Sequence, residues 1–133
     1  MRETFMNCEN LETVSFAGDA AILEGWVFFG CTSLKSISLP DSLAEIGQEA
    51  FSRSGLTSIV IPDGVTEVSS EAFYNCESLE TAYVPGSVTI IKKNAFGACD
   101  NLTDIYYGGS EDSWKSLYTW DLDGVKVHYN YLY

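Results

Sequence analysis

A phenylalanine that recurs at almost constant spacing constrains the fold more than any other feature of the chain. It stands at Phe5, Phe28, Phe51, Phe73 and Phe96, at intervals of 23, 23, 22 and 23 residues. A fixed period of about 20 to 29 residues is typical of solenoids, in which each unit stacks on the next because it cannot bury its apolar side chains alone. The spacing therefore predicts a stack of five similar units.

The residues around each phenylalanine follow one shared pattern, Ala-Phe-x-x-Cys-x-x-Leu-x-x-Ile-x-Ile-Pro-x-Ser-Val-x-x-Ile. The third unit is one residue shorter than the others and lacks the cysteine, which accounts for the single interval of 22 residues. The Ala-Phe-x-x-Cys stretch is too short for a long helix, and we expect it to form one helical or 3₁₀ turn.

Two further stretches in each unit have the residue types of strands. Residues 34–39, 56–61 and 79–84 end in alternating inward and outward residues, as a half-buried strand does. A proline closes each of these stretches, at Pro40, Pro62 and Pro85. A shorter stretch, such as residues 65–68, has two apolar residues three apart after a turn. Each coil is therefore expected to have a main strand, a short strand or extended run, and a turn.

This pattern resembles the BspA-like group of leucine-rich repeats, in which Leu-x-x-Ile-x-Ile-Pro replaces the usual Leu-x-x-Leu-x-Leu and Ala-Phe-x-x-Cys closes the coil. The resemblance covers Thr4 to about Tyr107 in five copies. It departs from the family pattern at Ala82 in place of isoleucine, and at Ala17 and Gly108 in place of proline. It implies an α/β solenoid, a right-handed leucine-rich-repeat coil with a parallel β-sheet and short helical turns.

The resemblance also implies a function without catalysis. Such domains are typical of secreted or cell-surface proteins, mainly bacterial, that take part in adhesion or bind a host or neighbouring-cell protein or glycan. A signal peptide would then lie upstream of residue 1. A structural spacer within a larger surface protein is the alternative function.

The five repeats are predicted to span residues 1–109, and a C-terminal helix-strand cap is predicted over 110–133. The unit boundaries fall at about 1–23, 24–46, 47–68, 69–91 and 92–109. Ser110 is expected to cap a short helix, whose Trp114, Leu117 and Tyr118 lie at helical spacing and cover the last coil. Trp120 is expected to shield the same end of the core. Residues 125–129 alternate as a strand does and should add a final rung to the sheet, where the exposed edge could pair with another chain.

The net charge of −12, from 19 acidic and 7 basic residues, argues against nucleic acid or an anionic membrane as the partner. No segment approaches the roughly 20 apolar residues of a membrane span, so no membrane insertion is expected. No nucleophile-base motif and no cofactor-binding motif is present in the sequence, which argues against an enzyme and predicts no cofactor. We expect a monomer.

The four cysteines Cys8, Cys31, Cys76 and Cys99 invite a metal or a disulfide interpretation. Their spacing lacks the close pairs of zinc sites, so no metal is expected. Stacking brings Cys8 near Cys31 and Cys76 near Cys99, within reach of a disulfide. Stacked side chains point in parallel, however, so we predict that all four cysteines are free and buried.

The outward residues of the main strands are the candidate binding surface, because stacking turns each outward position into a column. The central column contains Ser15, Ser38, Val60, Tyr83 and Tyr106. Tyr83 and Tyr106 are the predicted contacts, since tyrosine is enriched at interfaces, although it is also simply a good strand residue. Lys35, Glu80 and Asp104 in the neighbouring columns complete the predicted ligand-binding set.

His128, the only histidine, is expected to be a solvated strand residue. The aromatic residues of the cap leave a glycan site conceivable as well.

Overall fold

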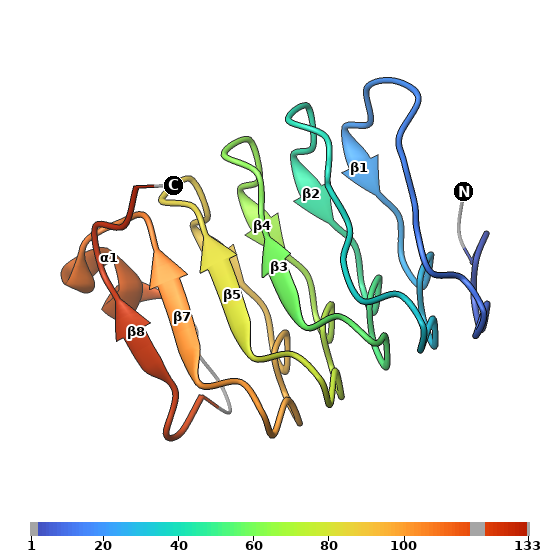
Figure 1. Cartoon of the computed structure of the whole chain (residues 1–133). Helices are drawn as coiled ribbons and strands as arrows, with labels where there is room; N and C mark the ends of the chain where they lie inside the picture. The colour runs from blue at the N-terminus through green and yellow to red at the C-terminus, as the bar shows by residue number, and fades with distance from the viewer. Residues whose placement is uncertain (1–2, 118–121, 133) are drawn as a thin grey trace.

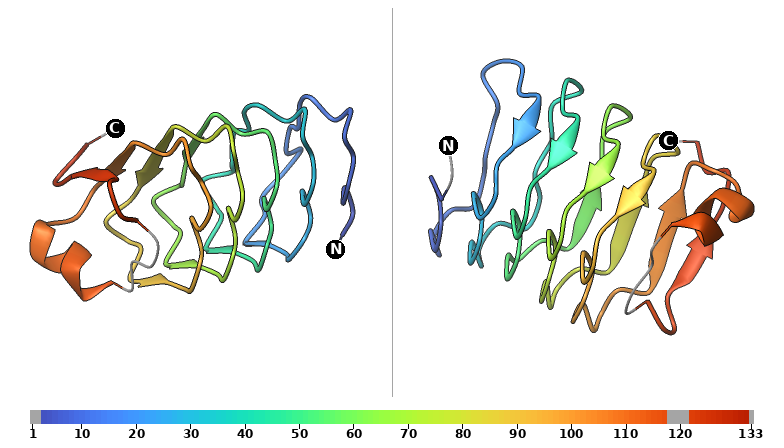
Figure 2. Two further views of the ribbon diagram at one scale, coloured as in Figure 1. Left: turned by 90° about the horizontal axis from the view of Figure 1, so that it is seen from below. Right: turned by 180° about the vertical axis from the view of Figure 1, so that it is seen from behind.

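The protein forms a solenoid built around two parallel four-stranded sheets (Figure 1). The structure is a computed structural model that describes residues 3–117 and 122–132. The main sheet contains β3 (Ser58–Val60), β5 (Thr81–Val84), β7 (Asp104–Tyr107) and β8 (Lys126–His128). The short-strand sheet contains β1 (Ile22–Leu23), β2 (Glu45–Ile46), β4 (Glu67–Val68) and β6 (Ile90–Ile91). The main sheet faces the viewer in Figure 1, and the short-strand sheet faces the viewer in the right-hand view of Figure 2. The predicted solenoid with a parallel sheet is confirmed.

The turn predicted around each phenylalanine is present, but it does not form a helix. Bonds from the N–H of Phe29 to the Trp26 carbonyl and from Cys31 to Phe28 close two single turns, and the equivalent bonds recur in other coils. The residues two before and two after each phenylalanine have positive φ, for example Trp26 (φ 58°) and Gly30 (φ 70°) around Phe28. The N–H groups of these three residues donate to carbonyls of the next coil, at 2.8 to 2.9 Å. A helix would direct its N–H groups back along its own axis and leave the neighbouring coil without donors. We call this third side of the solenoid the turn ladder.

The five phenylalanines stack on one another inside the turn ladder. The centroids of neighbouring rings lie 5.2 to 5.5 Å apart, and the ring planes are inclined by 2° to 16°. Phe51 and Phe73 are fully buried, whereas Phe5 is 39% exposed. The ladder of rings is therefore the part of the core that repeats most regularly along the solenoid axis.

The cysteine positions form a second ladder, in which three of the four thiols donate to the backbone of the preceding coil. The acceptors of Cys31, Cys76 and Cys99 are the carbonyls of Phe5, Phe51 and Phe73, at 3.0 to 3.1 Å from sulfur. These carbonyls belong to the preceding coil, so each of the three thiols adds a side-chain hydrogen bond between two coils to those of the backbone.

The third unit keeps a residue in this ladder although it lacks the cysteine. Ser54 takes the cysteine position, and its Oγ lies 3.5 Å from the sulfur of Cys76. The unit is one residue shorter directly after Ser54. There Gly55 passes so close to the previous coil that a Cβ would lie 2.0 Å from the Thr32 carbonyl oxygen. Only glycine fits this approach.

The prediction that all four cysteines are buried holds only for Cys31 and Cys76, since Cys8 and Cys99 are half-buried. Cys8 lies in the first described coil, and Cys99 lies in the last coil before the cap. Each therefore has a stacked coil on one side of its sulfur only. All four are free in this structure.

The predicted strand at residues 34–39 is absent, and the main sheet begins at β3. Its outward residues Ser36 and Ser38 are weaker strand formers than Val60 and the tyrosines of β5 and β7. The inward Ile37 is half-buried, whereas Ile59 in β3 is 1% exposed. A hollow of about 700 Å³ lined by residues 14–18 and 38–41 accompanies this looser packing.

The cap follows β7 as predicted. Helix α1 (Glu111–Ser116) begins at Ser110, whose Oγ accepts from the Ser113 N–H, and its Trp114 ring packs on Tyr107 at 5.0 Å. Trp114 and Leu117 are buried, so the helix covers the last coil. Strand β8 then pairs in parallel with β7, which confirms the final rung. Tyr118 and Trp120 lie outside the described residues.

Replacement of Phe51 by alanine should destabilise the protein by about 3–5 kcal/mol, because the fully buried ring contacts a neighbour on both faces. Phe5→Ala is the matched comparison, since Phe5 stacks on Phe28 alone and is partly exposed. Urea unfolding followed by circular dichroism measures both. Equal losses for the two variants would contradict a core made by stacking.

Thiol reactivity tests the cysteine ladder. Burial raises the pKa of the Cys31 thiol to about 11, so at pH 8 this sulfur is a neutral donor and a poor nucleophile. We expect four reactive thiols in denaturant and slower labelling of Cys31 than of Cys8 in the folded protein, measured by maleimide labelling and mass spectrometry. Fewer than four thiols in denaturant would show a disulfide.

Candidate functional site

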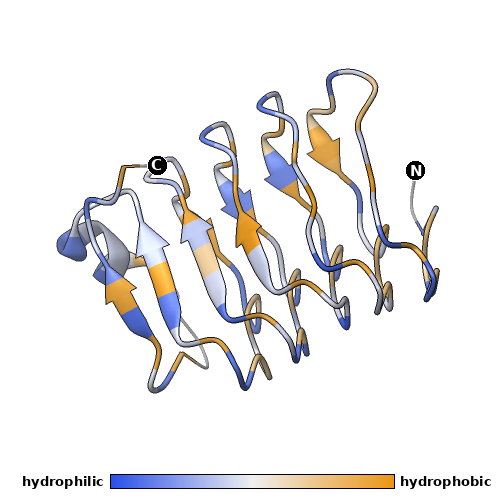
Figure 3. Cartoon of the chain, in the orientation of Figure 1, coloured by the Kyte–Doolittle hydropathy of each residue, from blue (hydrophilic) through white to orange (hydrophobic). Residues whose placement is uncertain are grey.

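The outward residues of the main sheet form columns because neighbouring strands pair in register. Val60 of β3 pairs with Tyr83 of β5, Tyr83 with Tyr106 of β7, and Tyr106 with His128 of β8. The strands alternate between outward and inward residues, and this alternation is visible in the hydropathy bands of β7 (Figure 3). The column therefore continues through the cap and ends in the histidine.

Four rings gather on this face, and we call Tyr83, Tyr106, His128 and Tyr131 the aromatic surface. The rings of Tyr83 and Tyr106 stack at 5.0 Å with planes 13° apart, and the His128 ring stacks on Tyr106 at 4.3 Å and 8°. The rings are stacked from strand to strand across the sheet. Their faces therefore cover one another, and their edges point away from the sheet.

Tyr131 lies across this stack instead of continuing it. Its ring is tilted by 48° and 55° to Tyr83 and Tyr106, with centroids 5.8 and 4.7 Å away. The backbone fixes its position, because the Tyr131 N–H donates to the Tyr107 carbonyl at 3.0 Å. Its side of the surface stays open to solvent, since Tyr131 is 37% exposed.

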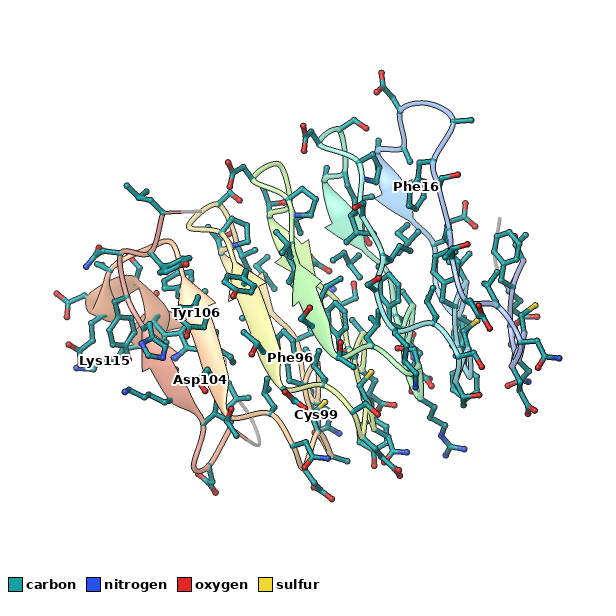
Figure 4. All side chains as sticks on the ribbon, viewed as in Figure 1. Phe16, Phe96, Cys99, Asp104, Tyr106 and Lys115 are labelled. Atoms are coloured by element: carbon teal, nitrogen blue, oxygen red, sulfur yellow. The ribbon has the colours of Figure 1, made fainter. Side chains whose placement is uncertain are left out.

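A carboxylate borders the aromatic surface. Asp104 lies on the same face of the sheet as Tyr106 (Figure 4), and its Oδ1 lies 2.7 Å from Nε2 of His128. The Thr103 hydroxyl donates to Oδ2 at 2.7 Å. These hydrogen bonds, that of His128 above all, lower the pKa of the Asp104 carboxyl. Burial, with a smaller contribution from the Asp104 charge, raises the pKa of the Tyr106 phenol, which is therefore neutral at physiological pH.

The expectation that His128 is merely solvated is wrong. Its side chain is 29% exposed, it pairs with Asp104, and one face of its ring is covered by Tyr106. The register of β8 on β7 explains the difference, because it places residue 128 opposite Tyr106 and next to Asp104.

The structure brings three of the five predicted site residues together, namely Tyr83, Tyr106 and Asp104. Glu80 is exposed one residue before β5. Lys35 is also exposed and lies in an earlier coil, where its Nζ donates to the Thr32 carbonyl at 3.3 Å. Sequence reasoning missed His128 and Tyr131 as members of the cluster. The alternation of residues 125–129 carried the signal for His128, because a strand added in register extends the tyrosine column by one residue.

The aromatic surface offers hydrogen bonds and apolar ring edges for noncovalent binding. Its polar atoms are the phenol oxygens and the Asp104 carboxylate. Within residues 3–117 and 122–132, no three or more His, Cys, Asp or Glu side chains are placed to hold a metal ion. The hydrogen bond between Asp104 and His128 holds the histidine ring against Tyr106.

The family of the chain follows from its repeats. The model of the BspA type leucine-rich repeat region matches residues 1–118 in six copies. The chain belongs to this family. Five units are predicted from the phenylalanine spacing, one fewer than the copies of the family model. No curated protein matches the chain.

Solved structures share the fold. A leucine-rich cell surface protein from Faecalibacterium prausnitzii is 27% identical with a TM-score of 0.70, over 80% of this chain and 34% of that one. The leucine-rich repeat protein of T. pallidum is 31% identical with a TM-score of 0.68, over 79% and 50%. The pneumococcal vaccine antigen PcpA is 16% identical with a TM-score of 0.74, over 96% and 33%, and shows the fold alone. This BspA-type chain thus spans between a third and a half of each of these proteins.

Replacement of His128 by glutamine should raise the pKa of Asp104 toward the ordinary aspartate value of about 3.9, because the strongest interaction that lowers it is removed. The ionised carboxylate contributes stability above its unfolded pKa, and this contribution is lost as the pH falls through the lower folded pKa. Carbon-13 NMR of the Asp104 carboxyl between pH 2 and 7 measures the shift. Lys126→Gln is the control and should change the pKa less. An unchanged Asp104 pKa in the His128 variant would contradict the pairing.

Proposed function

We propose that this domain is a non-catalytic recognition module that binds a partner protein through the aromatic surface and Asp104. The observation that supports this most directly is the cluster of four rings on the outward face of the main sheet. Tyrosine is a frequent interface anchor because its side chain is large, rigid and amphipathic. Exposed Val60, next to Tyr83 in the same column, extends the apolar part of the surface. Glu80 and Lys35 are proposed as contacts at its margin.

The rings are held before any partner arrives, which favours binding. Tyr106 lies between Tyr83 and His128 and under Tyr131, so few rotamers are open to it. A side chain that is already ordered loses less entropy in a complex, and more of the contact energy then appears as affinity. Four ordered rings thus form a better anchor than separate, mobile tyrosines would.

The stacking geometry favours a protein partner over a glycan. A sugar ring packs on the free face of an aromatic ring, but the facing sides of Tyr83, Tyr106 and His128 cover one another. The ring edges and hydroxyls that remain suit apolar side chains and backbone groups of a protein surface. A glycan partner is therefore treated as an outcome of the test below.

The domain is proposed to act outside the cell. The F. prausnitzii protein to which it is similar is a cell surface protein. Repeats of the BspA type are typically non-catalytic, in agreement with the proposed role. Among the described residues, no helix is long and apolar enough to cross a membrane.

A structural spacer within a larger surface protein is the second candidate. The unbroken succession of hydrogen bonds between coils would make a stiff rod, which is what a spacer requires. A spacer needs no ordered aromatic surface. If the domain is a spacer, changes at Tyr83 and Tyr106 should leave every interaction of the full protein intact.

Binding screens against extracellular proteins and glycans test the proposal, with Tyr83→Ala and Tyr106→Ala as the variants. We expect each variant to weaken protein binding by about tenfold or more, which corresponds to about 1.4 kcal/mol. Tyr74→Ala is the matched control, because this half-buried tyrosine belongs to the turn ladder. Binding that both variants leave unchanged would refute the site, and a glycan bound through these tyrosines would refute the protein partner.

A further inference from the structure

Two of the four thiols are stacked at the end of the cysteine ladder nearest the cap. Cys76 and Cys99 occupy the same position in successive coils. Each sulfur donates to the phenylalanine carbonyl of the coil before, at 3.1 Å to Phe51 and at 3.0 Å to Phe73. Because the same bond recurs at each level, the two side chains point in the same direction. Their sulfurs are therefore offset along the solenoid axis by one coil spacing, about 4.8 Å.

Sulfurs in this arrangement suit a bridging metal ion better than a disulfide. A disulfide requires a dihedral angle of about 90° across the two sulfurs, whereas side chains that point in parallel bring this angle near zero. A linear S–metal–S unit has no such requirement. Two metal–sulfur bonds of about 2.3 Å each, in one line, span nearly the coil spacing. An ion between the sulfurs of Cys76 and Cys99 thus needs no rotation of either side chain.

The shortened third unit places polar groups beside the sulfur of Cys76. Ser54 holds the cysteine position in the preceding coil, where it is buried, and its Oγ lies 3.5 Å from the Cys76 sulfur. Interaction with the Cys99 thiol above all, and with Ser54, lowers the pKa of Cys76 against the effect of burial. Hydrogen-bond donors around a sulfur stabilise the thiolate, which is the form that binds metals.

The Cys8–Cys31 pair differs from this arrangement. Burial raises the pKa of the Cys31 thiol to about 11, and Cys8 acts on it through its backbone and its charge. The Cys76–Cys99 pair is the one in which the thiols themselves interact and a buried hydroxyl lies next to a sulfur. Cys99 is half-buried, so an ion can reach this pair from solvent.

The chemistry of the pair selects a soft ion of low coordination number. A structural zinc ion takes four ligands. In the part of the chain that the structure describes, no group of three or more His, Cys, Asp or Glu side chains is placed to hold a metal. Two ligands suffice for Cu(I), which binds soft thiolates and which can be coordinated linearly by two of them.

We propose that Cys76 and Cys99 bind one Cu(I) ion between their sulfurs, with the Ser54 hydroxyl beside the sulfur of Cys76. Both thiols release their protons to solvent, and copper enters and stays as Cu(I), so the step needs no oxidant or reductant. The ion then joins two successive coils. This site shares no residue with the aromatic surface.

An anaerobic titration with Cu(I), in competition with a chromogenic Cu(I) chelator, tests the proposal. We expect the folded chain to take one tightly bound ion. X-ray absorption at the copper edge should show two sulfur ligands and no nitrogen ligand. The Tm should rise with added Cu(I), because the ion binds a site that exists in the folded protein.

Serine substitutions separate binding from folding, since Ser54 shows that serine fits the cysteine position. Cys99→Ser should weaken Cu(I) binding by about a hundredfold or more, because it removes one of two ligands. Cys76→Ser should do the same. Cys31→Ser is the matched control in the same ladder and should leave the affinity within about twofold. Ser54→Ala keeps both ligands and should weaken binding by about tenfold.

Three results would overturn the proposal. The first is an affinity that Cys76→Ser and Cys99→Ser leave unchanged. The second is an equal loss in Cys31→Ser, which would mean that the ion binds thiols without regard to this pair. The third is a copper site with nitrogen ligands or with more than two sulfurs. None of these results depends on Tyr83 or Tyr106, so the proposed function is tested separately.

Discussion

The hydrogen bonds between successive coils are the constraint on which the rest of the structure depends. Every coil must exchange backbone hydrogen bonds with its neighbouring coils at the spacing of parallel strands, on all three of its sides. This requirement explains why the chain accepts left-handed backbone twice per coil, at residues as different as Trp26 and Arg53. It also explains the glycine at position 55, where the shortened unit passes against Thr32, and the thiols that supply donors to the phenylalanine carbonyls.

The parts of the fold that could be predicted are those encoded by a repeating side chain. Phe51, Leu56 and Ile59 recur at fixed places because they face the core, so their spacing reveals the stack and its two strand positions. The turn at each phenylalanine was predicted but its ladder was not, because a local pattern does not show that the donors around Phe28 are used by the next coil, which lies 22 or 23 residues away. The strand at 34–39 was wrong for a related reason, since strand formation depends on the outward residues as well as on the inward ones.

The two tyrosines that the repeats contribute to the candidate site could be predicted from the sequence. The residues that the cap contributes were harder to predict. Tyr83 and Tyr106 occupy one column in any parallel arrangement of the repeats, and β-pairing places them there. His128 joins them only because α1 and the turn before β8 return the chain to the main sheet in exact register, a three-dimensional result of the cap. Tyr131 lies beyond the strand, where no repeat specifies the direction of a ring. The pairing of Asp104 with His128 links repeat and cap, and neither part predicts it alone.

Function in a repeat protein is most easily recognised where a residue departs from what stacking requires. The phenylalanines are explained by the core, and substitution there reports on stability. The aromatic surface is not explained in this way, because the tyrosine column adds apolar area to an exposed face. It stands on a frame in which hydrogen bonds between the coils fix the spacing of the tyrosines.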